Sequence, residues 1–330
     1  MIISKTPFRI SLLGGGTDYP AHFKQHGGAV LGFAIDKYCY ISVRRLPNFF
    51  EHKTRIAYTN IELVKDHKDI VHPAVRAVLQ TTNINEGLEI HHDADIPAKS
   101  GMGSSSAFTV GLLNALAALD GRMTTKRELA DSAIYIEQEV IKECVGCQDQ
   151  VWAAYGGLNK IEFYQDRDFA VSPIILSAKR RAEFEASLVL YFTGFSRIAS
   201  EVAAGQVARA KENAARLKHM RQMVDEGVSL LTSTAPLSYL GTLLNESWAM
   251  KRELAANVSD PKIDKIYQTG LAAGAWGGKL LGAGAGGFML FMVGNGERSA
   301  LRKAMSGLIE VGVKIDGDGS KIVLYQPNGL

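Results

Sequence analysis

The sequence has few cysteines and no long run of apolar residues. Its three cysteines, Cys39, Cys144 and Cys147, are an odd number and too few for a disulfide framework in 330 residues. The pair Cys144-x-x-Cys147 has no second pair to complete a zinc site, so reduced thiols are expected. The most apolar run, residues 107–119, is shorter than the roughly 20 residues that cross a bilayer. Because the N-terminus also lacks a signal-peptide pattern, we expect a cytoplasmic protein with no membrane partner.

A strong excess of charge of either sign is also missing. Lys and Arg number 37 and Asp and Glu 34, which gives a formal net charge of +3. This small, dispersed charge gives no reason to expect a nucleic-acid partner. Hydrophobic residues make up 46% and charged residues 22% of the chain, values typical of a globular protein with ample core. At about 150 residues per domain, the length predicts two domains, and a homodimer is the default expectation for assembly.

Hydrophobic periodicity predicts an α+β protein rather than a regular series of βαβ units. A Pro- and charge-rich segment, residues 166–181, predicts a domain junction, and we divide the chain into domains 1–178 and 179–330. Strands are expected at residues 2–13, 29–44, 87–92, 158–163, 188–192, 288–293 and 321–326. Helices are expected at residues 73–80, from about 106 to 119, and at 127–143, 200–224, 237–256, 264–273 and 298–311.

Glycine is abundant, at 33 residues, and it is concentrated in three segments where a backbone could approach an anion. The first glycine segment, Gly14–Tyr19, directly follows a predicted strand, and taken alone it is most simply a turn. The second glycine segment, Pro97–Ala107, leads into a helix whose first N–H groups and serine hydroxyls suit a polyphosphate. Its serines could instead serve only as an N-cap, but two glycines and three serines exceed what a cap needs.

The third glycine segment, Gly274–Gly287, contains the dinucleotide-binding spacing G-x-G-x-x-G at Gly282, Gly284 and Gly287. That motif should follow a strand and open a helix, whereas here a predicted helix precedes the segment and a predicted strand follows it. The segment is not a phosphate-binding Walker A loop either, because Leu280 stands where Ser or Thr is required. Neither common nucleotide motif therefore explains the third glycine segment.

Taken together, the three segments resemble the motifs of the GHMP kinase superfamily, which includes galactokinase, homoserine kinase and mevalonate kinase. Lys5–Gly14 is similar to its first motif and Lys279–Gly287 to its third. The second motif, Pro-x-x-x-Gly-Leu-Gly-Ser-Ser-Ala, is matched from Pro97 onward, with Met102 for Leu and Ser106 for the first Ala. The resemblance covers the whole chain. It implies a two-domain GHMP kinase fold, with an N-terminal ribosomal protein S5 domain 2-like part and a C-terminal ferredoxin-like α/β sandwich.

Within the superfamily, the phrase Arg-Ile-Ser-Leu-Leu-Gly-Gly-Gly-Thr-Asp-Tyr-Pro resembles D-glycero-D-manno-heptose 7-phosphate kinases. Gly15 and Gly16 stand where galactokinases have Glu and His. The resemblance implies ATP-dependent phosphorylation of the anomeric hydroxyl of heptose 7-phosphate, which supplies nucleotide-activated heptose for surface polysaccharide. A sugar 1-kinase acting on unphosphorylated fucose or galactose is the alternative with the same fold. An inactive homologue that senses a sugar or nucleotide is an alternative of another class.

The resemblance also implies the catalytic and metal-binding residues. Asp149, in a Gly-x-x-Asp-Gln segment, matches the catalytic Asp of galactokinases, and Arg9 falls where the family has a cation beside it. Such a pair could orient the acceptor hydroxyl and stabilise negative charge in the transition state. Mg²⁺ is expected on Ser104 (or its neighbour in the sequence) and Glu137, with Glu139 as the second choice for the carboxylate.

The remaining expected contacts concern ATP and the sugar. Arg197 suits a second phosphate on the sugar, and Arg44, Arg45, Lys99 and His22 compete with it for that role. The residues expected to bind ATP are Lys99, Ser100, Gly101, Met102, Gly103, Ser104, Ser105 and Ser106. The residues expected to bind the sugar are Gly14, Gly15, Gly16, Thr17, Asp18, Thr193, Gly194, Arg197, Gly282, Ala283 and Gly284.

Overall fold

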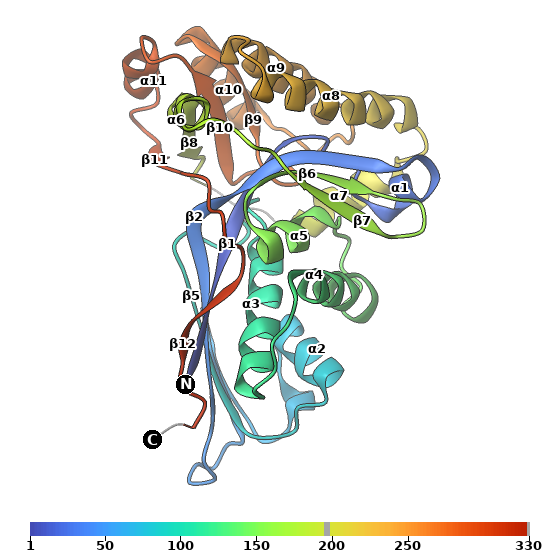
Figure 1. Ribbon diagram of the computed structural model, residues 1–330, viewed down its shortest axis with the longest axis vertical. Coiled ribbons are helices and arrows are strands. Elements are labelled where there is room, and N and C mark those ends of the chain that lie inside the picture. Colours follow the sequence, from blue (N-terminus) through green and yellow to red (C-terminus); the bar gives the residue numbers. More distant parts are fainter. Residues whose placement is uncertain (195–198, 329–330) are drawn as a thin grey trace.

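A computed structural model describes residues 1–194 and 199–328, and in it the chain forms two β-sheets with helices packed on them (Figure 1). The first sheet has the order β12-β1-β2-β5-β3-β4, and β6 and β7 extend it from β2. Its strands are β1 (Ile2–Leu13), β2 (Gly28–Arg45), β3 (Thr54–Ala57), β4 (Ile61–Val64), β5 (Leu88–Ala94), β6 (Leu158–Phe163), β7 (Phe169–Pro173) and β12 (Lys321–Tyr325).

The second sheet has the order β11-β8-β10-β9, and all of its neighbouring strands are antiparallel. Its strands are β8 (Leu188–Phe192), β9 (Ala275–Leu280), β10 (Phe288–Val293) and β11 (Ile309–Val311). In sequence order this sheet reads fourth, first, third, second, which is the strand order of a ferredoxin-like sheet. The expected architecture of the C-terminal half is therefore present.

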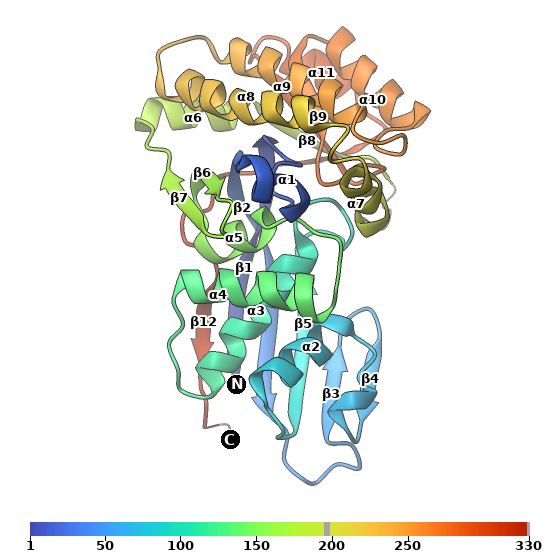
Figure 2. The same cartoon turned by 90° about the vertical axis from the view of Figure 1, so that its right-hand side faces the viewer.

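Helices pack on both sheets, and Figure 2 shows α8 to α11 together at the end of the molecule far from the two termini. The N-terminal helices are α1 (Pro20–His26), α2 (Pro73–Thr82), α3 (Ser104–Leu119), α4 (Lys126–Tyr135), the π-helical turn Ile136–Val140 and α5 (Gln148–Tyr155), together with the 3₁₀ turn His67–Asp69. The later helices are α6 (Ala178–Ser187), α7 (Ala199–Ala208), α8 (Ala214–Thr232), α9 (Leu237–Arg252), α10 (Pro261–Ala272) and α11 (Arg298–Ala304).

Two of these helices position the functional site. α3 is apolar on nearly every side and is buried between β1, β2 and the helices α2, α4 and α5, which fixes its N-terminus inside the molecule. α9 lies very close to β9, because a Cβ on Gly277 would stand only 1.8 Å from the carbonyl oxygen of Gly241. This glycine-to-glycine approach brings the C-terminal end of α9 against the third glycine segment.

Most predicted elements are present, but several segments differ from the prediction, and strand β7 and helices α1, α5 and α6 were not predicted. The helix expected at 200–224 is two helices, α7 and α8, and the buried Asn213 between them donates a hydrogen bond to the carbonyl of Leu254 at 3.0 Å. The helix expected at 298–311 is α11 followed by β11, because the chain turns after α11 to pair with β8. The third glycine segment is not all loop, since it contains β9. Strands β3 and β4 were not predicted.

The two ends of the chain meet in the first sheet. β12 pairs with β1, and the N- and C-terminal markers lie side by side in Figure 1. The last strand, which the division at residue 178 assigns to the second domain, therefore belongs to the first sheet. The division itself falls at the first residue of α6 and remains a prediction.

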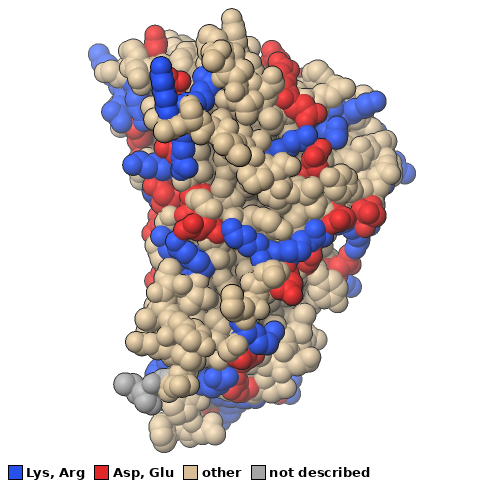
Figure 3. Space-filling model, viewed as in Figure 1, with Lys and Arg blue, Asp and Glu red and all other residues tan. Residues whose placement is uncertain are grey.

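The surface seen in Figure 3 carries Lys and Arg beside Asp and Glu, without a broad field of one sign. Many of these charges are paired on the surface, as in the ion pair between Arg167 and Glu139 at 2.9 Å. Among the residues that the structure describes, no helix is both long and apolar enough to cross a membrane.

Candidate active site

One pocket, with a volume of about 380 Å³, collects all three glycine segments. Pockets of this size hold small metabolites. Its walls come from the end of β1, the N-terminus of α3, the start of α5, and from α7, α9 and β9. The predicted residues that line it are Arg9, Gly15, Gly16, Asp18, Lys99, Gly101, Gly103, Ser104, Ser105, Ser106, Asp149, Gly282 and Ala283.

The second glycine segment forms a tight turn at the N-terminus of α3. Lys99, Gly101 and Gly103 all have positive φ, and Gly103 is an N-cap that provides no side-chain hydrogen bond to the helix. No side chain therefore caps the first N–H groups of α3. An anion can bind at a helix N-terminus when these N–H groups are uncapped. Ser105 is exposed and Ser104 partly exposed, so their hydroxyls can also reach a ligand in the pocket.

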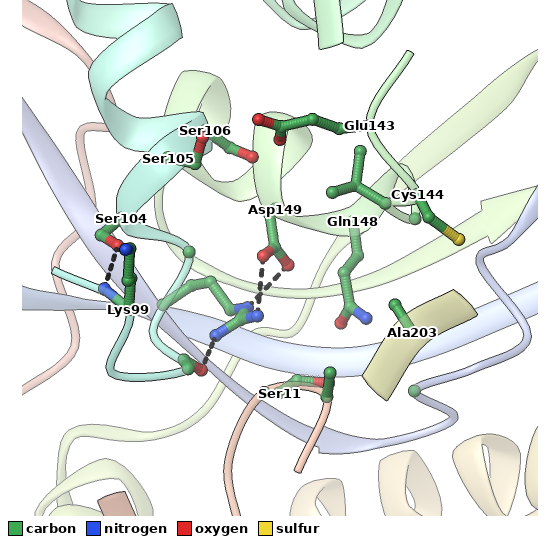
Figure 4. A pocket seen from close by; sticks show the side chains of 18 of the residues that line it. Ser11, Lys99, Ser104, Ser105, Ser106, Glu143, Cys144, Gln148, Asp149 and Ala203 are labelled. Atoms are coloured by element: carbon green, nitrogen blue, oxygen red, sulfur yellow. Dashed lines mark hydrogen bonds and ion pairs between the residues drawn. The ribbon is translucent and has the colours of Figure 1, made fainter. Parts of the chain in front are cut away.

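Arg9 and Asp149 form a two-pronged ion pair in the middle of the pocket (Figure 4). The Nε and Nη2 atoms of Arg9 each donate to a carboxylate oxygen of Asp149 at 2.8 Å. Arg9 also donates through Nη1 to the carbonyl of Gly101 at 2.6 Å, and its backbone N–H bonds the carbonyl of Met102. The arginine thus connects the carboxylate of Asp149 to the second glycine segment. This paired geometry fixes both side chains, as bidentate arginine contacts do.

Asp18 is buried in the same pocket, with 1% of its surface exposed. Its carboxylate accepts hydrogen bonds from the N–H of Gly16 at 3.0 Å and from the N–H of Gln148 at 3.4 Å. Burial and the neighbouring Asp149 raise the pKa of Asp18. Gly146 is required for this approach, because a Cβ there would lie 1.9 Å from Oδ2 of Asp18. The Gly-x-x-Asp-Gln segment therefore packs on the first glycine segment.

The third glycine segment closes the pocket against the second. A Cβ on Gly282 would stand 2.4 Å from the Cα of Gly101, so the two backbones touch. Two lysines that the sequence interpretation did not place in the site also line this wall, Lys251 of α9 and Lys279 of β9. Nζ of Lys251 donates to the carbonyls of Gly282 and Leu280, and both lysines are buried.

Two carboxylates near Ser106, those of Glu137 and Glu143, have the oxygen donors that Mg²⁺ prefers. The carboxylate of Glu137 is fully buried, accepts a hydrogen bond from Ser106 at 2.8 Å, and keeps one oxygen without a partner. Burial raises the pKa of Glu137 to about 7. Glu143, which lines the pocket, points toward Ser105 and Ser106 in Figure 4 and makes no side-chain hydrogen bond or ion pair with any described residue.

These residues fit the divalent cation that accompanies ATP. No cluster of three or more His, Cys, Asp and Glu occurs in residues 1–194 and 199–328, but Mg²⁺ needs only one or two carboxylates besides phosphates and water. The structure joins Glu137 to Ser106, whereas Ser104 accepts a hydrogen bond from the backbone N–H of Lys99 at 3.3 Å. Glu139, the second choice, is exposed and paired with Arg167, away from the pocket.

Several residues that were expected to bind a ligand form hydrogen bonds with the backbone or lie in the core. The hydroxyl of Thr17 donates to the carbonyls of Gly14 and Ala29, and the hydroxyl of Thr193 donates to the carbonyl of Gly287. Met102 is fully buried in the core. Arg197 lies outside the described residues. The predicted residues that do not line the pocket in the described part of the chain are Gly14, Thr17, Ser100, Met102, Glu137, Thr193, Gly194 and Gly284.

Sequence reasoning missed several residues of the pocket wall. Lys251 has no motif around it, and its position depends on the packing of α9 on β9. Glu143 could have been found, because it stands six residues after Glu137, before the Gly-x-x-Asp-Gln segment. The other pocket residues that were not expected to touch a ligand are Ser11, Tyr19, His72, Pro73, His92, Ala98, Phe108, Cys144, Val145, Gly146, Gln148, Ala203, Gln206 and Lys279.

Comparison with known proteins shows the family to which the chain is related. The GHMP kinases N terminal domain matches residues 69–157, and the GHMP kinases C terminal domain matches residues 235–309. The chain is 30% identical over 315 residues to the D-glycero-alpha-D-manno-heptose 7-phosphate kinase of Campylobacter jejuni, covering 92% of this chain and 93% of that protein. It is 26% identical to the L-fucokinase/L-fucose-1-P guanylyltransferase of Bacteroides fragilis, covering 92% of this chain and 35% of that protein.

Solved structures share the fold. The D-glycero-D-manno-heptose 1-phosphate kinase of Bacteroides thetaiotaomicron superposes with a TM-score of 0.81 at 22% identity, covering 99% of this chain and 100% of that one. The putative sugar kinase of Campylobacter jejuni superposes with a TM-score of 0.71 at 29% identity, with 97% of each chain covered. The two-domain fold expected from the three motifs is therefore confirmed, and the chain belongs to the GHMP kinase family as a sugar kinase.

Proposed function

We propose that the protein transfers the γ-phosphate of Mg·ATP to the anomeric (C1) hydroxyl of D-glycero-D-manno-heptose 7-phosphate. The product, heptose 1,7-bisphosphate, would supply nucleotide-activated heptose for surface polysaccharides. The observation that carries the proposal is the Arg9–Asp149 pair, which is hydrogen-bonded to the second glycine segment inside the pocket. The similarity to the Campylobacter jejuni heptose 7-phosphate kinase over 92% of the chain supports the choice of sugar.

Each part of the pocket has a separate role in this reaction. Backbone N–H groups at the start of α3 and the hydroxyls of Ser104 and Ser105 bind the phosphates of ATP. Asp149 accepts a hydrogen bond from the sugar hydroxyl and orients its oxygen toward the γ-phosphate, and it can take the proton as the new bond forms. Arg9 holds the carboxylate in place and stabilises the negative charge that develops on the transferred group.

Two further groups complete the site. Asp18 accepts hydrogen bonds from sugar hydroxyls through a carboxylate that its own turn already holds in position. Mg²⁺, when bound, neutralises charge on the ATP phosphates, and Glu137 with Ser106 and Glu143 are the residues that would hold it. Figure 4 shows Glu143 on the same side of the pocket as Ser105, and Glu137 is hydrogen-bonded to the neighbouring Ser106.

Phosphorylation of an unphosphorylated sugar is the second candidate. The similarity to the bifunctional fucokinase/GDP-fucose pyrophosphorylase of Arabidopsis thaliana, at 25% identity over 94% of this chain, favours it. The two candidates share the pocket and the chemistry, and they differ only in whether the acceptor already carries a phosphate.

A sugar panel distinguishes the candidates. ADP release is measured with heptose 7-phosphate, free heptose, fucose and galactose, each at several concentrations. We expect kcat/KM for heptose 7-phosphate to exceed that for the free sugars by at least a hundredfold, and phosphorus NMR of the product to show a phosphate on C1. Equal or greater kcat/KM with an unphosphorylated sugar would replace the first candidate by the second.

A further inference from the structure

The pocket contains two buried lysines that its carboxylates do not pair. Arg9, Lys251 and Lys279 line it together with Asp18, Asp149 and Glu143, and each of the two lysines is no more than 6% exposed. Only Arg9 forms an ion pair with one of these carboxylates. Both lysines donate to backbone carbonyls and make no ion pair with a described carboxylate. A buried ammonium without an ionic partner is costly, so its presence indicates an anion that arrives with a ligand.

Lys251 is the lysine that contacts a residue expected at the sugar. Its Nζ donates to the carbonyls of Leu280 and Gly282, and Gly282 is one of the residues that the resemblance assigns to the sugar. Nζ of Lys279 donates instead to the carbonyl of Leu12 within β1 at 2.7 Å. The two hydrogen bonds of Lys251 to carbonyls leave a third N–H of its ammonium group for a ligand.

Three of the cations that compete with Arg197 for a second phosphate are paired or neutral and lie away from the pocket. Arg44 is paired with Glu89, and Arg45 with Glu86 at 2.7 Å. His22 is buried, and burial lowers its pKa to about 4, so its ring is neutral near pH 7. None of these three side chains lines the described pocket.

Lys99 lines the pocket, but it is exposed and belongs to the segment that feeds α3. Its position at the phosphate-binding turn places it on the ATP side. Among the described cations considered, Lys251 is the buried one that contacts a residue expected at the sugar.

We propose that Lys251 binds the phosphate group that the acceptor sugar already carries, and that it selects sugar phosphates over neutral sugars. This inference rests on the proposed kinase function and names the residue that sets its substrate class. The ammonium of Lys251 stays fixed to the carbonyls of the third glycine segment, so the phosphate meets a cation that is already positioned. A charge-assisted hydrogen bond in such a buried position contributes most of the discrimination.

The test replaces the ammonium with an uncharged side chain of the same length. Lys251→Met is compared with wild type and with Lys265→Met, which removes an exposed lysine from α10. Kd values for heptose 7-phosphate, free heptose and ATP are measured by calorimetry, and KM and kcat are measured with the same three ligands. We expect Lys251→Met to weaken the binding of heptose 7-phosphate by about 10- to 100-fold, the range of one charge-assisted hydrogen bond. Affinity for free heptose and for ATP should change less than threefold, and Lys265→Met should match wild type.

Three results would overturn the inference. Equal losses for heptose 7-phosphate and free heptose would make Lys251 a structural support of the third glycine segment. A selective loss of ATP affinity would assign it to the nucleotide. If Lys251→Met does not fold, the wild type still provides a test, because inorganic phosphate should then compete with heptose 7-phosphate and not with ATP. Absence of that competition would also refute the role. These outcomes differ from failure of the proposed function, in which the wild type phosphorylates no sugar.

Discussion

Replacing Asp149 with asparagine tests the centre of the proposed mechanism. The change keeps the shape of the side chain, but it removes the negative charge and turns one hydrogen-bond acceptor toward Arg9 into a donor. At least one of the two 2.8 Å hydrogen bonds from Arg9 is then lost. Loss of a proton acceptor costs about 10²- to 10⁴-fold in rate, or about 3–5 kcal/mol of transition-state stabilisation. We expect kcat of Asp149→Asn to fall by at least about 10²-fold.

The same substitution should affect stability only moderately. The side chain of Asp149 is 26% exposed, so water screens its ion pair with Arg9. We therefore expect the free energy of unfolding to fall by about 1–3 kcal/mol. Binding of ATP should change only a few-fold, because Asp149 lies in α5 and not in the second glycine segment.

The assay measures ADP release under saturating substrates, with ATP binding measured by calorimetry and stability by urea unfolding. Asp69→Asn, which changes an exposed aspartate that does not line the pocket, is the matched control. A kcat for Asp149→Asn within tenfold of wild type would refute the assignment of Asp149. Loss of ATP binding together with turnover would instead show that the carboxylate supports the nucleotide site.

Three further predictions concern other parts of the pocket. Gly101→Ala should abolish ATP binding, because a Cβ there would lie 2.6 Å from a carbonyl oxygen of the third glycine segment. The control Gly121→Ala, which also has positive φ but has open space around it, should bind ATP normally. Glu143→Gln should raise the Mg²⁺ concentration needed for half-maximal nucleotide binding about tenfold, measured by titration, while Glu139→Gln should not; equal midpoints would contradict the metal role. Burial lowers the pKa of Lys251 to about 7, so at pH 8 its amine is mostly neutral and should take up a proton when a sugar phosphate binds. Calorimetry in two buffers of different ionisation enthalpy measures that uptake, and affinity should fall as the pH rises above 7.

The sequence predicted the pocket well where function depends on short, local segments. The second glycine segment needs Gly101 and Gly103 for its positive φ values, and their spacing is visible in the chain itself. The pairing of Arg9 with Asp149, in contrast, joins residues 140 positions apart. It could be expected only through the resemblance to a family, because periodicity does not show which strand end faces which helix.

The residues expected to bind Mg²⁺ stay a prediction, for which the resemblance and the hydrogen bonds of the structure favour different serines. The expected partner of Glu137 was Ser104, whereas the structure joins Glu137 to Ser106, two residues further along α3. A shift of two residues on a helix turns a side chain to another face, which motif spacing does not resolve. Glu143 lines the pocket from the segment that follows the π-helical turn, which ends at Val140.

By itself the sequence determined the α+β class, most strands and helices, the three glycine segments and the family, because hydrophobic periodicity and glycine spacing act over short distances. Only the tertiary structure decided which side chains share the pocket. Lys251 comes from α9 and reaches the site because Gly241 and Gly277 let that helix lie directly on β9. The return of β12 to β1 likewise depends on pairing between the two ends of the chain. Such contacts arise from packing between distant segments, and burial of a charge in a shared pocket is a property of the assembled fold.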